Sequence, residues 1–323
     1  MIMYLRWMRA GLALLLLVGC MPSGWAGCTA TVSAGNLGTQ NSYDVSSTPL
    51  TTSVSSGLKC TGSLLNLGGT NTITAVIGAT LHPDVNQPRL YSAATGQYLP
   101  YNLCKDSGCG AVYVQGSSII WSSTTALDLL GLFTSPGGTL PIFIRPQMSS
   151  NLAAGTYTDT IPINWSWNIC TVAIGGICVP DTGSITSGSA ISLSLVVTNF
   201  CYIDSAPNVG FGTAALPSGL TTVVSNTISV RCTLNASYSV NLTSSVASSG
   251  QYRQMASTVN GTTSYIQYQL FKGDGTVWTA ATNSNAMGAG TSQSFPYTAS
   301  VNLSQNNQPA GGYSDTVTVT VAY

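Results

Sequence analysis

Cysteine is the residue type in this chain whose spacing points to covalent chemistry, namely disulfide formation. Cys28 and Cys60 lie 32 residues apart, and Cys201 and Cys232 lie 31 residues apart. The segments that begin at Cys28 and Cys201 read CTATVSAGNLG and CYIDSAPNVGFG, and the two are similar in pattern. A repeated spacing of this kind indicates an internal duplication, in which equivalent cysteines are expected to form equivalent bonds. The sequence therefore predicts the disulfides Cys28–Cys60 and Cys201–Cys232.

Four further cysteines fall into two short local pairs, which predicts the bonds Cys104–Cys109 and Cys170–Cys178. Cysteines that pair evenly are expected of an exported chain, where disulfides persist. A zinc site is not expected, because the cysteines lack C-x-x-C spacing and the only histidine, His82, has no histidine partner. We therefore predict no metal ligands and no cofactor.

The N-terminal segment has the pattern of an export signal, and we assign residues 1–26 to it. Arg6 and Arg9 flank the start of an apolar run, and Gly24-Trp25-Ala26 places small residues at both positions that determine cleavage. An alternative stays open, because the segment that ends in Cys20 reads LVGC, which resembles a lipoprotein box and would place a lipid on that cysteine. In either case the sequence predicts export.

Titratable residues are too few and too scattered for acid–base catalysis, so no catalytic residue and no enzymatic activity are predicted. Charged residues make up 6% of the chain, and none of them is glutamate. General acid–base chemistry needs paired titratable groups in a pocket. The sequence contains neither a G-x-S-x-G motif nor a glycine-rich phosphate loop. Without the signal, seven Lys and Arg face nine Asp, and this balance excludes the basic footprint of a nucleic-acid-binding protein.

Short stretches of alternating apolar and polar residues, separated by Gly, Asn, Ser or Pro, indicate β-strands throughout the chain. Their density predicts an all-β protein built from two tandem immunoglobulin-like, pilin-type β-sandwiches. We assign the first sandwich to residues 27–170, a disulfide-clipped linker to residues 171–190 and the second sandwich to residues 191–323. The strand that completes the first sandwich is left open, since residues 191–199 are candidates for either domain. Residues 126–133 are the one plausible helical turn.

The two modules close on similar phrases, but only the first phrase leads into more chain. Residues 154–165 read AGTYTDTIPINW, and residues 311–323 read GGYSDTVTVTVAY. The sequence continues beyond the first phrase and stops at the second, so the second sandwich is expected to be incomplete and to hold an apolar groove. A donor strand from another chain can fill such a groove. We predict that the alternating residues of the last strand line it, namely Val317, Val319, Val321 and Tyr323.

These phrases, together with CTATVS at Cys28 and NVGFG at Asn208, give the sequence a resemblance to the spore coat protein U domain family. The resemblance covers nearly all of the chain after the signal and implies the fold of archaic chaperone–usher pilins. Two such domains in tandem, with only Gly27 before the first cysteine and hence no strand to donate, are similar to the tip adhesins of Csu-type pili.

The resemblance implies a route through the periplasm to the pilus tip on the surface of a Gram-negative bacterium. The implied partners are a periplasmic pilus chaperone, an outer-membrane usher, an adjacent pilin that donates a strand to the second domain, and an abiotic or host surface. The first domain is expected to attach to that surface, and to support biofilm formation, through exposed apolar loops. The residues expected in these loops are Leu64, Leu65, Leu67, Ile119, Trp121, Leu129, Leu132 and Phe133.

Two other functions stay open from the sequence alone. The first is a carbohydrate-binding fimbrial lectin, in which aromatic rings stack on sugars. The candidate rings are those of Tyr91, Tyr98, Tyr101, Tyr113 and Trp121. The second is a purely structural coat or pilus-shaft protein, against which the tandem domains and the missing donor extension argue.

Overall fold

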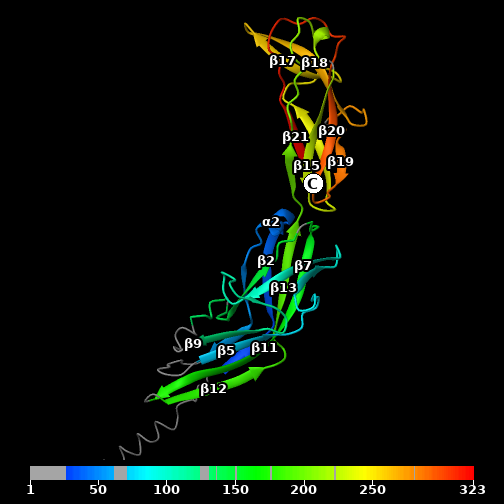
Figure 1. Cartoon of the computed structure of the whole chain (residues 1–323). Coiled ribbons are helices and arrows are strands. Elements are labelled where there is room, and N and C mark those ends of the chain that lie inside the picture. Colours follow the sequence, from blue (N-terminus) through cyan, green and yellow to red (C-terminus); the bar gives the residue numbers. More distant parts are fainter. Residues whose placement is uncertain are drawn as a thin grey trace, which may run out of the picture.

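The computed structural model of this protein describes residues 27–323 except for residues 62–70, 124–130, 136, 150, 175–176, 222 and 280, and the side chains of residues 61, 123 and 170–179. The predicted export signal and Cys20 lie outside the described residues. The described chain is almost entirely β-structure and forms two elongated domains placed end to end (Figure 1). This arrangement confirms the predicted all-β class with two tandem sandwiches.

The first domain is built on one large sheet whose strands run in the order β2-β13-β11-β6-β7-β10-β3. Strands β5 and β12 pair with β11, β9 pairs with β5, β8 pairs with β7, and β1 and β4 form a separate ribbon. The elements are β1 (Gly27–Ala30), β2 (Ser33–Asn41), α2 (Ser42–Ser47), β3 (Thr52–Ser55), β4 (Leu58–Thr61), β5 (Asn71–Ile77), β6 (Arg89–Ser92), β7 (Gln97–Cys104), β8 (Val112–Tyr113), β9 (Ser118–Ser123), β10 (Pro141–Pro146), β11 (Gly155–Ile174), β12 (Ile177–Ile185) and β13 (Ala190–Thr198).

The second domain packs a five-stranded sheet of order β14-β15-β20-β18-β17 against a three-stranded sheet of order β19-β16-β21. Its elements are β14 (Cys201–Ser205), the 3-10 turn η1 (Pro217–Gly219), β15 (Val223–Cys232), β16 (Ser237–Ser244), β17 (Arg253–Val259), β18 (Thr262–Lys272), β19 (Ser284–Met287), β20 (Ser292–Val301) and β21 (Val317–Ala322). Strand β21 lies at the edge of its sheet and pairs only with β16.

Each domain has its own apolar core, because alternation along the strands sends every second side chain inward. In the first core the rings of Trp121 and Trp165 stack with their centroids 6.1 Å apart. In the second core Trp278 is fully buried and meets the ring of Tyr297 edge-on. The two cores share no residue among the described part of the chain. The cores therefore support two separate folding units.

The boundary between the domains differs from the expected one. Strand β13 lies in the sheet of the first domain, antiparallel to β11 and parallel to β2. Residues 190–198 therefore belong structurally to the first domain rather than to the second, and only Asn199 and Phe200 connect the domains. The expected linker of residues 171–190 instead holds the end of the long β11–β12 hairpin and the turn into β13. Strand pairing between distant segments decided this, and local sequence patterns do not encode it.

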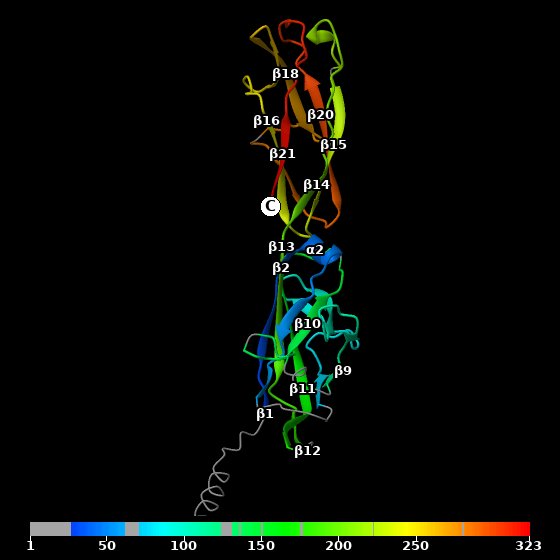
Figure 2. The same cartoon turned by 90° about the vertical axis from the view of Figure 1, so that its left-hand side faces the viewer.

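The domains meet at a compact joint next to α2, which Figure 2 shows between the end of β13 and the start of β14. The hydroxyls of Ser42 and Thr233 are hydrogen-bonded at 2.7 Å in a buried position. Ala153 and Leu234 form a parallel β-bridge across the joint. The ring of Tyr43 meets Tyr202 edge-on at 5.2 Å. Buried polar and aromatic contacts from both domains therefore fix how they are joined.

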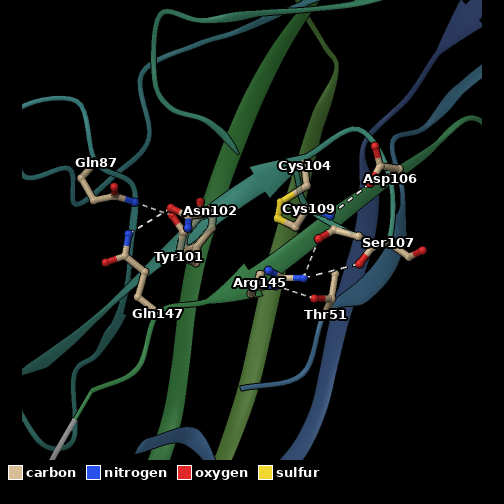
Figure 3. Close-up of a disulfide and its surroundings, with 11 residues drawn as sticks. Thr51, Gln87, Tyr101, Asn102, Cys104, Asp106, Ser107, Cys109, Arg145 and Gln147 are labelled. Carbon is tan, nitrogen blue, oxygen red and sulfur yellow. Dashed lines mark hydrogen bonds between the residues drawn. A yellow bond between two sulfur atoms is a disulfide. The ribbon is translucent and has the colours of Figure 1, made fainter. Parts of the chain in front are cut away.

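Three of the four predicted disulfides are present, Cys28–Cys60, Cys104–Cys109 and Cys201–Cys232. Figure 3 shows the Cys104–Cys109 bond at the end of β7, where the Arg145 guanidinium donates to Thr51 Oγ1 at 2.7 Å and to the Gly108 carbonyl at 3.1 Å. The predicted pair Cys170–Cys178 lies outside the side chains that the structure describes. The confirmed bonds support the duplication inferred from cysteine spacing.

The described helical elements are short. The expected turn at residues 126–133 lies mostly outside the described residues, and α2 was not expected from the sequence. Asn41 caps α2 by accepting hydrogen bonds from the amides of Tyr43 and Asp44. No helix in the described part of the chain is long and apolar enough to cross a membrane.

Candidate strand-acceptor groove

The second domain holds a cavity of about 430 Å³ that opens between the segment after β14 and the strand β21. Most of the residues that line it are apolar or aromatic and come from both sheets, and Asn208, Ser314 and Asp315 add polar side chains. The lining includes Val209, Phe211, Ile228, Leu242, Met255, Tyr268, Leu270, Tyr297, Val317 and Val319.

Strand β21 forms one wall of the groove and leaves one of its edges without a partner strand. Its burial alternates along its length, so that Val317, Val319 and Val321 pack against the second core while Thr318 and Thr320 face outward. On one side β21 pairs with β16. In the described chain no strand pairs with its other side. A free edge above an apolar floor is the arrangement that accepts an added strand.

In the first domain the equivalent edge of β11 is covered by β13 up to Pro162 and by β12 from Trp165 onward. Tyr157 and Asp159 at the start of β11 stand where Tyr313 and Asp315 stand before β21. Every second side chain of β13 is buried, and Ser192, Val196 and Thr198, which lie between the buried residues, are exposed. The buried residues are Ile191, Leu193, Leu195 and Val197. The two domains thus present one groove with a strand in it and one groove without.

Two hydrogen-bonded tyrosines confirm that β11 and β21 are equivalent strands. The Tyr157 hydroxyl donates to the Ala153 carbonyl at 2.9 Å, and the Tyr313 hydroxyl donates to the Pro309 carbonyl at 2.7 Å. Both bonds reach back four residues along the chain and pin the turn before the strand, as tyrosine corners do in immunoglobulin-like domains. Tyr157 is fully buried, whereas Tyr313 lines the groove and is only half-buried.

A tyrosine–aspartate pair recurs beside each of these strands. Tyr101 donates to Asp159 Oδ2 at 2.8 Å, and Tyr268 donates to Asp315 Oδ2 at 2.5 Å. The two carboxylates differ in exposure, because Asp159 is 2% exposed while Asp315 is half-buried at the groove. The same pair is therefore seen once on a strand that pairs with β13 and once beside an open groove.

The pKa values of the two carboxyl groups are shifted in opposite directions. Burial raises the pKa of Asp159, and hydrogen bonds from Tyr101 and the amides of Thr160 and Leu81 offset this only in part. Burial also opposes the ionisation of Asp315, but the hydrogen bonds that its oxygens accept outweigh burial and lower its pKa. The donors are the Tyr268 hydroxyl, the Ser245 amide and hydroxyl and the Val246 amide. Burial likewise raises the pKa of Tyr101 and of Tyr268.

One buried cation lies behind the groove. The guanidinium of Arg253 on β17 donates to the carbonyls of Leu242 and Trp278 at 2.8 and 2.7 Å and to Ser244 Oγ at 2.6 Å. Burial lowers its pKa, and the nearby Tyr268 and Asp315 act in the opposite direction. These bonds tie β17 to β16 across the two sheets and hold the groove floor in place.

The structure places three of the four predicted groove residues at the groove or its core. Val317 and Val319 line the groove, and Val321 packs against the same core. Tyr323 does not line it, because its side chain is 55% exposed and its ring lies 6.2 Å from that of Phe200 at the joint. Alternation alone placed Tyr323 in the groove, but β21 ends at Ala322 and the final residue leaves the strand.

The predicted apolar loops are corrected in part. Ile119 and Trp121 are buried at 0% and 2% exposure in the first core, whereas Ile120 between them is 52% exposed. Three consecutive apolar residues in a strand cannot all face one side, because successive side chains point to opposite faces. Leu132 and Phe133 are half-buried and pack against the first core. Leu64, Leu65, Leu67 and Leu129 lie outside the described residues.

An exposed turn of the first domain, centred on Val85, was not among the predicted contact residues. Val85 is 86% exposed and has a φ of 57°, a conformation that β-branched residues rarely adopt. Leu81, at the start of the same loop, is also exposed. Pro83, Asp84 and Asn86 around Val85 are turn-forming residues and indicate a loop, but they do not indicate that Val85 adopts a positive φ.

The aromatic residues proposed for sugar stacking do not form one site. Trp121 and Tyr101 are buried in the core, and Tyr113 is half-buried. Tyr91 and Tyr98 do meet, with ring centroids 4.8 Å apart, but His82 lies 4.7 Å from Tyr91 and the Arg89 guanidinium covers Tyr98 at 4.3 Å. The ring faces are thus occupied by one another and by their neighbours. Within the described residues no group of three or more His, Cys, Asp or Glu side chains is placed to hold a metal ion.

One known protein family matches most of the chain. A family model, the Spore Coat Protein U domain, matches residues 15–164 and again residues 188–320. The second match begins two residues before β13, the strand that lies in the first domain. No curated protein sequence matches the chain.

Solved structures also match the chain. One is the crystal structure of the CsuC–CsuE chaperone–tip adhesion subunit pre-assembly complex from the archaic chaperone–usher Csu pili of Acinetobacter baumannii. It aligns with a TM-score of 0.64 at 24% identity over 92% of this chain and 100% of that chain, which shows a shared fold. The CupB6 tip adhesin of Pseudomonas aeruginosa aligns with a TM-score of 0.32 at 16% identity over 85% of this chain and 87% of its own. A chaperone–tip adhesin complex of CFA/I fimbriae aligns with a TM-score of 0.30 at 8% identity over 91% of this chain and 96% of its own.

Proposed function

Because the chain belongs to the spore coat protein U domain family, we propose that it is the tip adhesin subunit of an archaic chaperone–usher pilus. The observation that carries the proposal is the contrast between two equivalent grooves. Strand β13 of this chain covers the groove of the first domain, and the groove beside β21 is open. A subunit of this form needs one neighbouring strand, because its first domain is already complete.

In this proposal the second domain first accepts a strand of a periplasmic chaperone and later, at the outer-membrane usher, the donor strand of the next pilin. The groove offers two kinds of binding energy. The free edge of β21 supplies main-chain hydrogen bonds, and the apolar floor accepts alternate side chains of the incoming strand. Burying one Leu or Val side chain is worth about 1.5–3 kcal/mol, so several such side chains offset the cost of ordering a strand.

The first domain faces outward in this proposal and attaches the pilus to a surface, as a first step of biofilm formation. The end of the domain farthest from the joint carries β9 and the β11–β12 hairpin (Figure 1). Ile120 on β9 is exposed there and replaces Ile119 and Trp121 as a candidate contact. Leu64, Leu65, Leu67 and Leu129 remain candidates, and an exposed apolar patch on such a domain is a usual sign of an interaction site.

The groove is tested by co-expressing the full chain with a periplasmic chaperone of an archaic pilus and measuring co-purification. We expect a stable complex that Val319→Asp abolishes, because a carboxylate in the groove floor would be buried without a partner. Thr320→Asp is the matched control, since Thr320 lies on the same strand and faces outward. Equal recovery of the complex with both variants would contradict the groove assignment. Hydrogen exchange of each purified variant checks that the second domain is still folded.

The adhesive role is tested with Leu64→Ser, Leu65→Ser and Leu67→Ser combined in one chain. We expect cells that carry this variant to attach less to plastic while secreting normal amounts of the protein, because surface contact depends on apolar area. Free sugars added to the assay separate this role from that of a lectin. Unchanged attachment would remove the cluster from the proposal, and inhibition by a sugar would favour the lectin.

A further inference from the structure

The end of the second domain that lies away from the first domain carries the same two kinds of segment that the first domain contributes to the joint. Two segments of the first domain build its side of the joint, namely α2 and the loop before β11. In the second domain η1 precedes the Cys232 strand as α2 precedes the Cys60 strand, and the loop of residues 302–316 precedes β21. Both counterparts lie at the end away from the first domain, where Figure 2 shows β18 and the loop that leads into β21.

The equivalence is specific at one residue. The carbonyl of Ala153 accepts the Tyr157 hydroxyl, and the carbonyl of Pro309 accepts the Tyr313 hydroxyl. Ala153 is the residue that forms the parallel bridge to Leu234 across the joint. Pro309 is therefore placed to make the corresponding contact with a domain that docks beyond the second one.

The same end of the second domain also carries a polar hollow. A hollow of about 470 Å³ opens beside the 302–308 loop on the outer face of β17 and β18. Its lining is uncharged and consists of amide, hydroxyl and phenol side chains, of which Tyr265 is 40% exposed. The existing joint uses the same chemistry, since Ser42 bonds to Thr233 and Asn151 packs against Gly290.

We propose that the loop of residues 302–310 and η1 form a docking surface for the folded body of the next pilin domain, arranged as the second domain is arranged on the first. This proposal rests on the proposed function, because the docked domain is the one whose strand enters the groove. At the existing joint, and at the proposed one, the strand that enters the groove and the domain that docks beside it are consecutive parts of one chain. Strand β13 enters the groove of the first domain, and the domain that comes after it, beyond Asn199 and Phe200, packs on the joint.

The proposal predicts how far the donor-strand residues of the next subunit lie from its first cysteine. In this chain the buried residues of β13 precede Cys201 by ten, eight, six and four residues. The next subunit should therefore carry large aliphatic residues at those four distances before its own first cysteine. A longer or shorter connection would hold the body away from the docking surface, even with the strand in place.

The test extends the full chain beyond Tyr323 by a flexible Gly/Ser linker and a second copy of residues 189–323. Pro309→Cys in the original second domain is combined with Leu234→Cys in the appended copy. Neighbouring strands lie about 4.8 Å apart, within the Cα separation of about 4.4–6.8 Å that a disulfide spans. Ala153→Cys with Leu234→Cys across the natural joint is the positive control. Asn260→Cys, in the β17–β18 turn at the same end, with the appended Leu234→Cys is the negative control.

We expect loss of both added thiols for the Pro309 pair and the Ala153 pair, and retention of both for the Asn260 pair. A synthetic peptide of residues 189–199 reports on the grooves, and one peptide should bind per extended chain because the appended strand fills one of two grooves. One bound peptide without the Pro309 cross-link would overturn the docking surface and leave the groove intact. Two bound peptides, or none, would overturn the groove assignment on which both proposals rest.

Discussion

At the scale of the residue, the two tyrosine–aspartate pairs show how burial and hydrogen bonding shift the pKa of a carboxyl group. Asp159 lies on β11 opposite Leu193 of β13 and is buried, so its pKa is raised from the ordinary 3.8. Asp315 lies beside the open groove, and the hydrogen bonds it accepts lower its pKa despite partial burial. The tyrosine partner is the same in both domains, and the difference follows from the deeper burial of Asp159 and from the backbone and hydroxyl donors that surround Asp315.

These shifts predict opposite pH dependences. A lowered folded pKa means that Asp315 stabilises the second domain above pH 3.8, and this contribution is lost as the pH falls through the folded value. A raised folded pKa means that Asp159 favours the first domain below pH 3.8, and this contribution is lost as the pH rises through the folded value. Asp315→Asn should therefore flatten the loss of second-domain stability as the pH falls below about 4.

Asp159→Asn is the matched variant, and it should remove the gain in first-domain stability that accompanies a fall in pH toward 3.8. Denaturant unfolding followed by hydrogen exchange, which reports each domain separately, is the measurement. The same pH slope in Asp315→Asn as in the unaltered chain would show that the carboxylate is not stabilised in the fold.

At the scale of the element, β13 is the strand whose sequence neighbourhood and structural position disagree. The second family match begins at residue 188, yet β13 completes the sheet of the first domain. Its buried face is made of large aliphatic residues, and its outer face is mostly Ser and Thr. The strand therefore couples the two repeats, because removing the second domain from residue 188 onward would also remove a strand of the first.

Leu195→Ala should lower the stability of the first domain by about 2–5 kcal/mol, because it leaves a cavity at a fully buried site. Val196→Ala is the control on the opposite face of the same strand and should change stability by no more than about 0.5 kcal/mol. Thermal unfolding resolved by domain is the measurement. A loss confined to the second domain would contradict the assignment of β13.

The disulfides act on elements through loop closure. Cys201–Cys232 closes a span of 31 residues, and Cys104–Cys109 closes a span of 5 residues. If loop entropy dominates, the first bond is worth about 3–4 kcal/mol and the second about 2 kcal/mol. Cys201→Ser should therefore be degraded in the periplasm, and Cys104→Ser should persist at a higher level. Immunoblots of periplasmic extracts measure this, and equal levels would argue against a stabilising role specific to the long loop.

At the scale of the whole molecule, the two domains share one fold, but β13 pairs with β11 in the first domain and no described strand occupies the corresponding place beside β21 in the second. Two separate cores and a joint of few residues predict two unfolding transitions. A peptide of residues 189–199 should raise only the second-domain transition, since β13 already covers the first groove. At a concentration one hundred times its Kd the gain should be about 2.7 kcal/mol. Calorimetry with and without peptide measures it, and a shift of the first-domain transition would show exchange with β13 instead.

Local sequence patterns were enough to predict several features of the protein. Cysteine spacing predicted the duplication and three confirmed disulfides, and alternation predicted the all-β class and the groove residues Val317 and Val319. The assignment of β13 to the first domain follows from the folded chain alone, because strand pairing joins segments far apart in the sequence. The folded chain also decides that Ile120, and not Ile119 or Trp121, faces solvent. A strand has a period of two residues, so a shift of one position reverses every side chain, and only the packed sheet fixes that choice.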